Sequence, residues 1–175
     1  RGHQQNRGFE EVTSPIVMFV HADVVLPMGW SHIVLQALSE TIYVAGAFQI
    51  KTVPDPDISS WADPFLFLAN LRSRYTKLPY GDQCIFARTS AVQQIGGYPE
   101  QEIFEDLEFS KKLSKVGKIK IQKQKVQASG RRMQQRPIYF FVMINLLPGL
   151  YRMGMNSKTI KKIYSSNKTK KPTSI

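Results

Sequence analysis

Residues 15–23 read Pro-Ile-Val-Met-Phe-Val-His-Ala-Asp, a continuous apolar run that ends in a polar trio. Its β-branched and aromatic members predict a buried strand of a parallel sheet, which delivers Asp23 at its carboxyl end. Pro27 and Gly29 then interrupt the pattern, and apolar residues recur at helical spacing from Trp30 to Leu38. The order of strand, loop and helix predicts the start of an α/β layer.

The same alternation continues along the chain. A β-rich run spans residues 42–50, and the pair Asp63-Pro64 is a typical helix start, so we expect a helix over residues 63–75. Residues 83–88 form a second strand-like run, and an amphipathic pattern predicts a helix over residues 102–116. This rhythm predicts an α/β fold with a mainly parallel sheet flanked by helices.

Charge is distributed very unevenly over the 175 residues, whose net charge is +11. All 13 acidic residues lie between Glu10 and Glu108, whereas residues 111–175 contain 17 Lys and Arg and no acid. Such a block predicts a basic surface that attracts anionic lipid headgroups or ligand phosphates. Nucleic acid is an unlikely partner, because aliphatic residues rather than stacking aromatics separate the lysines of residues 111–125.

Two further features bear on the compartment. Cys84 is the one cysteine, so no intramolecular disulfide can form, and we expect a cytoplasmic protein without a signal peptide. Residues 137–156 are mostly apolar but short of the ~20 continuous apolar residues that a spanning helix needs. Arginines flank this segment, which predicts an interfacial helix at an anionic membrane surface, the inner face of the membrane. A core helix is the alternative, and residues 157–175 are expected to form a basic, disordered tail.

Three acidic positions stand at predicted element ends: Asp23 after a strand, Asp82 before a strand, and Glu105-Asp106 at a helix start. Ligands of open α/β sheets bind beyond the carboxyl ends of the strands, so these side chains are expected to meet there. Carboxylates at such an edge can bind Mg²⁺ or Mn²⁺ together with substrate phosphates, and a further carboxylate can act as a base. Each acid taken alone also has a structural reading, as a cap or turn residue or as a partner of the helix dipole.

The order of several motifs carries more information than any one of them. They are Val20-His-Ala-Asp-Val24, Ala45-Gly-Ala-Phe48, Pro79-Tyr-Gly-Asp-Gln83, Ile95-Gly-Gly-Tyr-Pro-Glu100, Glu105-Asp-Leu-Glu-Phe-Ser110 and Gly130-Arg-Arg132. In this order they resemble family 2 glycosyltransferases, which have the GT-A fold. More narrowly, they are similar to the subgroup with a Phe-Leu-His-Ala-Asp signature that is often assigned to arsenosugar biosynthesis. The resemblance covers about residues 1–155, and it implies that residues 1–136 form the C-terminal portion of a GT-A domain.

The resemblance implies an inverting transfer of a sugar from a nucleotide-diphosphate donor to an acceptor hydroxyl. Residues His21, Ala22 and Asp23 match the donor-binding DxD position, with Asp23 as the ligand of Mg²⁺ or Mn²⁺, and Asp106 matches the catalytic base. The acceptor side would be lined by Gly81, Asp82, Gln83 and Glu105. A loose match to a Gln-x-x-Arg-Trp motif would bind the donor phosphates through Arg131, Arg132, Gln135 and Arg136, although no Trp follows Arg136.

Two departures from the family pattern qualify this interpretation. His21 replaces the first Asp of the commoner DxD motif, which lowers the negative charge at the metal site. Residues 1–8 resemble the segment just before the metal-binding strand, so we expect the strands of the nucleotide-base pocket to be missing and the chain to be a poor catalyst by itself. The alternatives are a catalytically inactive remnant that binds a glycan, a lipid or a partner protein, and a basic membrane-surface module.

Overall fold

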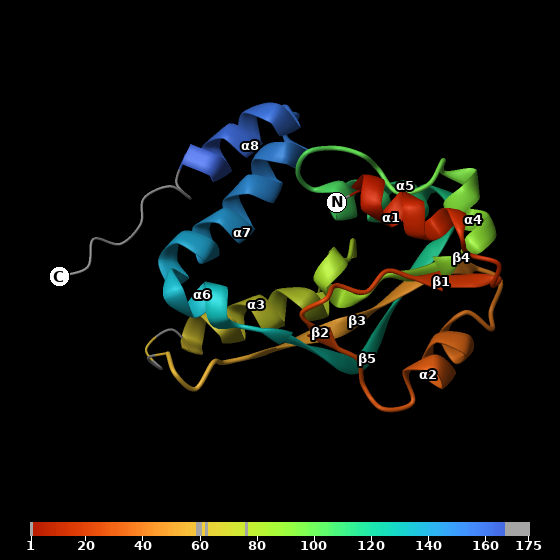
Figure 1. Cartoon of the computed structure of the whole chain (residues 1–175), viewed down its shortest axis with the longest axis horizontal. Coiled ribbons are helices and arrows are strands. Elements are labelled where there is room, and N and C mark those ends of the chain that lie inside the picture. The colour runs from red at the N-terminus through yellow and green to blue at the C-terminus, as the bar shows by residue number, and fades with distance from the viewer. Residues whose placement is uncertain (1, 59–60, 62, 76, 167–175) are drawn as a thin grey trace.

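The computed structural model describes residues 2–58, 61, 63–75 and 77–166, and its described strands form a single five-stranded sheet (Figure 1). The order across the sheet is β1-β4-β3-β5-β2. The strands are β1 (Ile16–Met18), β2 (Val24–Val25), β3 (Tyr43–Val53), β4 (Phe86–Arg88) and β5 (Lys118–Ser129). The helices are α1 (Gly2–Glu10), α2 (Trp30–Ala37), α3 (Asp63–Tyr75), the 3-10 turn η2 (Gly81–Gln83), α4 (Thr89–Gln94), α5 (Glu105–Val116), α6 (Arg131–Gln135), α7 (Pro137–Arg152) and α8 (Ser157–Ser166). The predicted α/β class is confirmed.

The direction of the strands differs from the prediction. The long pair β3 and β5 is parallel, whereas β1 with β4, β3 with β4, and β2 with β5 are antiparallel. The described sheet is therefore mixed, and a mainly parallel sheet is not confirmed. The apolar run of residues 15–20 does contain a strand, but β1 ends at Met18, so Asp23 directly precedes β2 instead of following the first strand. An apolar run also has the same pattern in either direction. Its orientation is set by β4, which runs between β1 and β3 against both.

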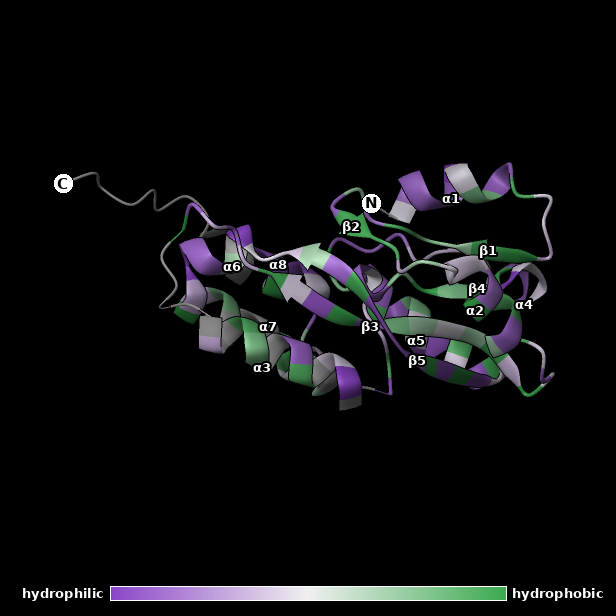
Figure 2. Cartoon of the chain, turned by 90° about the horizontal axis from the view of Figure 1, so that it is seen from below, coloured by the Kyte–Doolittle hydropathy of each residue, from purple (hydrophilic) through white to green (hydrophobic). Residues whose placement is uncertain are grey.

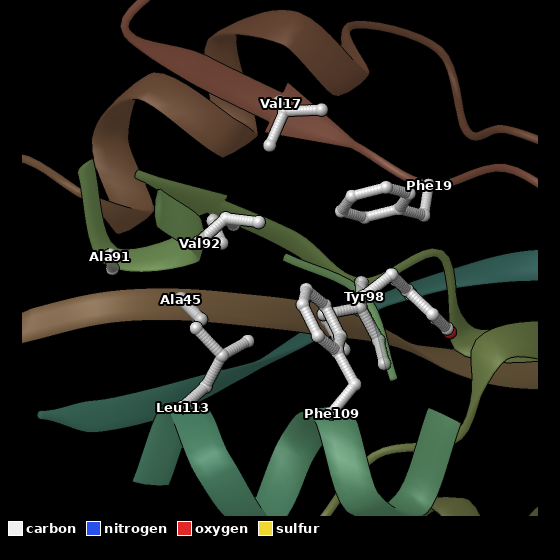
Figure 3. Packing of buried hydrophobic residues seen from close by; sticks show 11 residues of the cluster. Val17, Phe19, Ala45, Ala91, Val92, Tyr98, Phe109 and Leu113 are labelled. Atoms are coloured by element: carbon white, nitrogen blue, oxygen red, sulfur yellow. The ribbon is translucent and has the colours of Figure 1, made fainter. Parts of the chain in front are cut away.

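Each face of the sheet has its own hydrophobic core. On one face, α1, α4 and α5 cover residues of β1 and β3, and three rings meet at the centre: Phe19, Tyr98 and Phe109 (Figure 3). The rings of Tyr98 and Phe109 stack at 4.3 Å, and Phe19 meets Phe109 edge-on at 5.2 Å between centroids. On the other face, α2 packs on β3, with Phe48 fully buried. Because α5 begins against the first core, that core positions the start of the helix.

The C-terminal segment departs from the prediction of a disordered tail over residues 157–175. Residues 157–166 form α8, in which Ile160 is fully buried and Lys161 pairs with Glu102 at 3.3 Å. The buried side chain of Ile160 thus anchors a segment whose composition is mostly polar. Residues 167–175 lie outside the described part of the chain. None of the described helices is long and apolar enough to cross a membrane.

Candidate functional site

Three segments that are far apart in the sequence meet around Gly81. The Gly81 N–H donates a 2.8 Å hydrogen bond to Oδ2 of Asp106, in the first turn of α5. A methyl group on Gly81 would lie 2.6 Å from Nε2 of His21 and 3.3 Å from Oδ2 of Asp106. The residue must therefore be a glycine for the imidazole and the carboxylate to approach the turn this closely. The structure thus brings together the predicted His21, Gly81 and Asp106.

Both carboxylate oxygens of Asp106 are oriented by the backbone. Oδ2 accepts the hydrogen bond from Gly81, and Oδ1 accepts one of 2.8 Å from the Leu107 N–H. The N-terminal turn of α5 also contains Glu105 and Glu108, and the helix dipole favours negative charge there. Each oxygen keeps a second lone pair, so the held carboxylate can still accept a hydrogen bond from a ligand hydroxyl.

Two residues next to these segments have a left-handed backbone. Among the described residues that are not glycine, positive φ angles occur at Cys84 (50°) and Phe104 (61°). Cys84 directly follows η2, and Phe104 directly precedes the Glu105-Asp106 pair. Each such residue costs about 1–3 kcal/mol, and this kind of strain is concentrated at functional sites. The two outliers therefore mark the surroundings of Gly81 as a candidate site.

The Cys84 thiol is fully buried beneath this site. Burial raises its pKa from 9.0 to about 11, a hydrogen bond with the His21 backbone opposes the rise, and the charge of Asp82 adds to it. The thiol therefore stays protonated at neutral pH, which makes Cys84 a poor nucleophile and metal ligand. The hydrogen bond also places the His21 backbone beside the end of η2, the turn that contains the half-buried Asp82.

Gln83 has a structural task that the sequence did not reveal. Its side chain is 1% exposed, and Nε2 donates to the Phe48 carbonyl of β3 at 2.9 Å. Oε1 accepts a hydrogen bond of 3.1 Å from the Tyr80 N–H. These bonds attach η2 to the centre of the sheet. The side chain was expected to bind the acceptor, but its burial directs it inward, so it holds the turn in place.

The Asp23 segment lies at the end of the sheet where β5 finishes. β2 pairs with β5 in the register Val24↔Ala128, and continuing this register places the exposed Asp23 opposite Ser129. Ala22 beside it is also exposed. Because α6 begins at Arg131, two residues after Ser129, the predicted donor residue and the start of the basic segment share one edge of the sheet.

The predicted phosphate-binding residues differ in their surroundings. Arg131 and Gln135 are exposed and Arg136 is half-buried, whereas the side chain of Arg132 lies outside the described part of the structure. The segment is anchored by Gln134, which the sequence did not single out. Its side chain is 3% exposed, and its Oε1 accepts a 2.7 Å hydrogen bond from the Asp55 N–H. The fixed backbone leaves Arg131 free to face solvent at this edge.

Sequence reasoning also missed the residues that hold the loop before α5. The Tyr151 hydroxyl of α7 contacts Oε2 of Glu108 at 3.1 Å and Oε1 of Gln101 at 3.2 Å, and its ring lies 5.5 Å from that of Phe104. At the other end, Asn6 of α1 forms hydrogen bonds of 2.7 and 2.9 Å with the Tyr98 backbone. No local pattern predicts such contacts, because their partners are 43–92 residues apart.

Within the described residues, no group of three or more His, Cys, Asp or Glu side chains is arranged to hold a metal ion. No protein-family model matches the chain, and no curated protein matches its sequence.

Proposed function

We propose that this chain carries the metal- and acceptor-binding residues of a family 2 glycosyltransferase with the GT-A fold. It would transfer a sugar, with inversion, from a nucleotide-diphosphate donor to an acceptor hydroxyl. One observation supports the proposal most: the motif order assigns His21 to the donor side and Asp106 to the base, and both lie against Gly81. A chance resemblance gives no reason for motifs so far apart in the sequence to lie against the same residue.

Asp106 is the base in this proposal. Its carboxylate takes the proton of the acceptor hydroxyl as that oxygen attacks the anomeric carbon from the side opposite the leaving nucleoside diphosphate. A single displacement of this kind inverts the anomeric configuration. The hydrogen bonds from Gly81 and Leu107 fix the orientation of the carboxylate before the acceptor binds, so the carboxylate loses little further conformational freedom when it reacts.

Asp23 is the proposed ligand of a divalent cation. Mg²⁺ and similar ions are commonly bound by one or two carboxylates plus substrate phosphates and water, so an exposed single carboxylate fits a cation that is shared with the donor diphosphate. When bound, such a cation neutralises the charge that develops on the leaving diphosphate. Arg131, at the same edge of the sheet, would bind a phosphate oxygen through its guanidinium group.

The proposal is tested by measuring Mn²⁺-dependent binding of UDP-, GDP-, CDP- and dTDP-sugars, and release of the nucleoside diphosphate. Asp23→Ala should lose binding together with the metal requirement, whereas Asp106→Asn should keep binding and lose transfer. Glu11→Ala, which removes an exposed carboxylate from the segment between α1 and β1, is the control and should change neither. Metal-independent donor binding by Asp23→Ala, or equal loss of binding and transfer in Asp106→Asn, would contradict the assignment.

A binding protein without catalytic activity is the second candidate. It is favoured by the structural use of Asp106, whose two oxygens already link η2 to the start of α5. This candidate predicts metal-dependent nucleotide binding by the unmodified chain with no product from any donor. Its Asp106→Asn variant would then lose stability without any catalytic change.

A further inference from the structure

Among its described side chains, α7 exposes two apolar residues and the amide of Asn145. Ile138 and Leu146 are 62% and 50% exposed, and Met153, directly after the helix, is 84% exposed. Their spacing of eight and seven residues places them on one side of a helix. The next residue, Leu147, points the other way and is 2% exposed. α7 is therefore attached to the protein by one face, and the opposite one presents a stripe of Ile138, Leu146 and Met153 that Asn145 interrupts.

Positive charge lies on the neighbouring helix α8. Lys158 and Lys162 of α8 are exposed, whereas Lys161 is engaged with Glu102. No Asp or Glu occurs anywhere in residues 109–175, so this part of the chain has no acid of its own to neutralise these lysines. Figures 1 and 2 both show α7 and α8 gathered at the end of the molecule away from α2 and α4. The apolar and basic groups thus lie on the same end of the protein.

We propose that α7 and α8 form a docking surface for an anionic lipid bilayer. The stripe of Ile138, Leu146 and Met153 enters the boundary between headgroups and acyl chains, while Lys158 and Lys162 contact lipid phosphates. Exposed apolar residues on one side of α7 and exposed lysines on the adjoining α8 match this layered surface better than an acidic protein, which would lack the apolar layer. The proposal does not depend on glycosyl transfer.

Sedimentation with vesicles tests the proposal directly. The chain should bind vesicles of phosphatidylglycerol mixed with phosphatidylcholine, bind phosphatidylcholine alone far more weakly, and be released as NaCl is raised. Leu146→Glu should lower the partition coefficient at least about tenfold, because a negative side chain that the anionic lipids repel replaces an apolar side chain that enters the bilayer. Leu35→Glu is the matched control, since Leu35 is a 61% exposed leucine on α2, and it should leave binding unchanged.

A second pair of variants tests the basic component. The double variant Lys158→Gln/Lys162→Gln should weaken binding about thirtyfold, since each lysine at a membrane surface contributes about a factor of five. Lys123→Gln/Lys125→Gln removes the same charge from exposed positions on β5 and should change binding less than about twofold.

Ile138→Glu supplies an independent test of the stripe should Leu146→Glu reduce folding, which far-ultraviolet circular dichroism would reveal. The proposal is overturned if the chain does not bind anionic vesicles, which is the result expected of a surface for an acidic protein. It is also overturned if the control variants reduce binding as much as the variants on α7 and α8.

Discussion

Replacing Gly81 with alanine probes the contact on which the candidate site depends. The added methyl group would lie 2.6 Å from Nε2 and 2.9 Å from Cε1 of His21, closer than non-bonded atoms approach. The imidazole must move, and overpacking of this kind costs about 1–3 kcal/mol. For a chain of this size, that loss lowers Tm by roughly 2–12 °C. The low end applies if the ring of His21 turns outward to solvent.

A double-mutant cycle isolates the contact from other effects of the substitution. Urea denaturation of Gly81→Ala should show the loss in the normal background, and most of it should disappear in His21→Ala, where the imidazole is absent. Gly8→Ala provides a control of opposite sign. Gly8 is helical, and a methyl group there meets nothing within 4 Å, so alanine should stabilise by about 0.5–1 kcal/mol. An equal penalty for Gly81→Ala with and without His21 would refute the proposed convergence.

Three further predictions concern the groups around the site. Burial raises the pKa of the Cys84 thiol to about 11, so the thiol of the unfolded chain ionises at lower pH than that of the folded chain. The free energy of unfolding should therefore be unaffected by this group below pH ~9 and should fall by about 2 kcal/mol as the pH rises to ~11. Urea denaturation at several pH values should show this fall in the unmodified chain and a smaller one in Cys84→Ala. Tyr151→Phe should cost about 0.5–1.5 kcal/mol and speed amide exchange in residues 101–104, because the hydroxyl contacts are lost and the ring remains; unchanged exchange would show that these contacts do not hold the loop. Asn6→Ala should destabilise by about 1–3 kcal/mol in urea denaturation, since the Tyr98 backbone loses both side-chain partners, whereas a neutral result would remove α1 from the support of this loop.

Local signals predicted the elements well. The Asp63-Pro64 pair correctly predicted the start of α3, and helical spacing predicted α2 and α5 within a few residues. Strand direction was not predictable in the same way, because alternation and apolar content are unchanged when a strand is reversed. The helix α8 was missed because its one fully buried described side chain, Ile160, stands among polar residues, and its burial depends on tertiary packing that the local pattern does not show.

The candidate site shows the same division. The structure places His21 and Asp106 against Gly81, and it places Asp23 opposite the end of β5. The sequence predicted that the carboxylates of Asp23, Asp82 and Asp106 would meet. It did not reveal that Gln83 is buried, because burial depends on how η2 meets β3. Nor did it identify Tyr151, whose partners lie on another helix and a distant loop.

Part of the basic block has a simpler explanation than a ligand. β5 pairs with β3 along its length but with β2 only at residues 127–128, so within the described sheet its outer edge is open over residues 118–126. Lysines on such an edge discourage pairing with other chains, and this strand has four: Lys118, Lys120, Lys123 and Lys125. Lys120 is also engaged with Glu40 at 3.3 Å. The charge of β5 is therefore accounted for without phosphate binding.

Paramagnetic broadening by Mn²⁺ tests most directly whether the candidate site around Gly81 binds a metal and a nucleotide. Amide signals would be recorded with UDP, GDP, CDP or dTDP, first with Mg²⁺ and then with trace Mn²⁺. We predict selective broadening at His21, Asp23, Gly81 and Asp106, and none at Gly8 or Ala37. Broadening confined to other residues, or none despite measured nucleotide binding, would contradict the account.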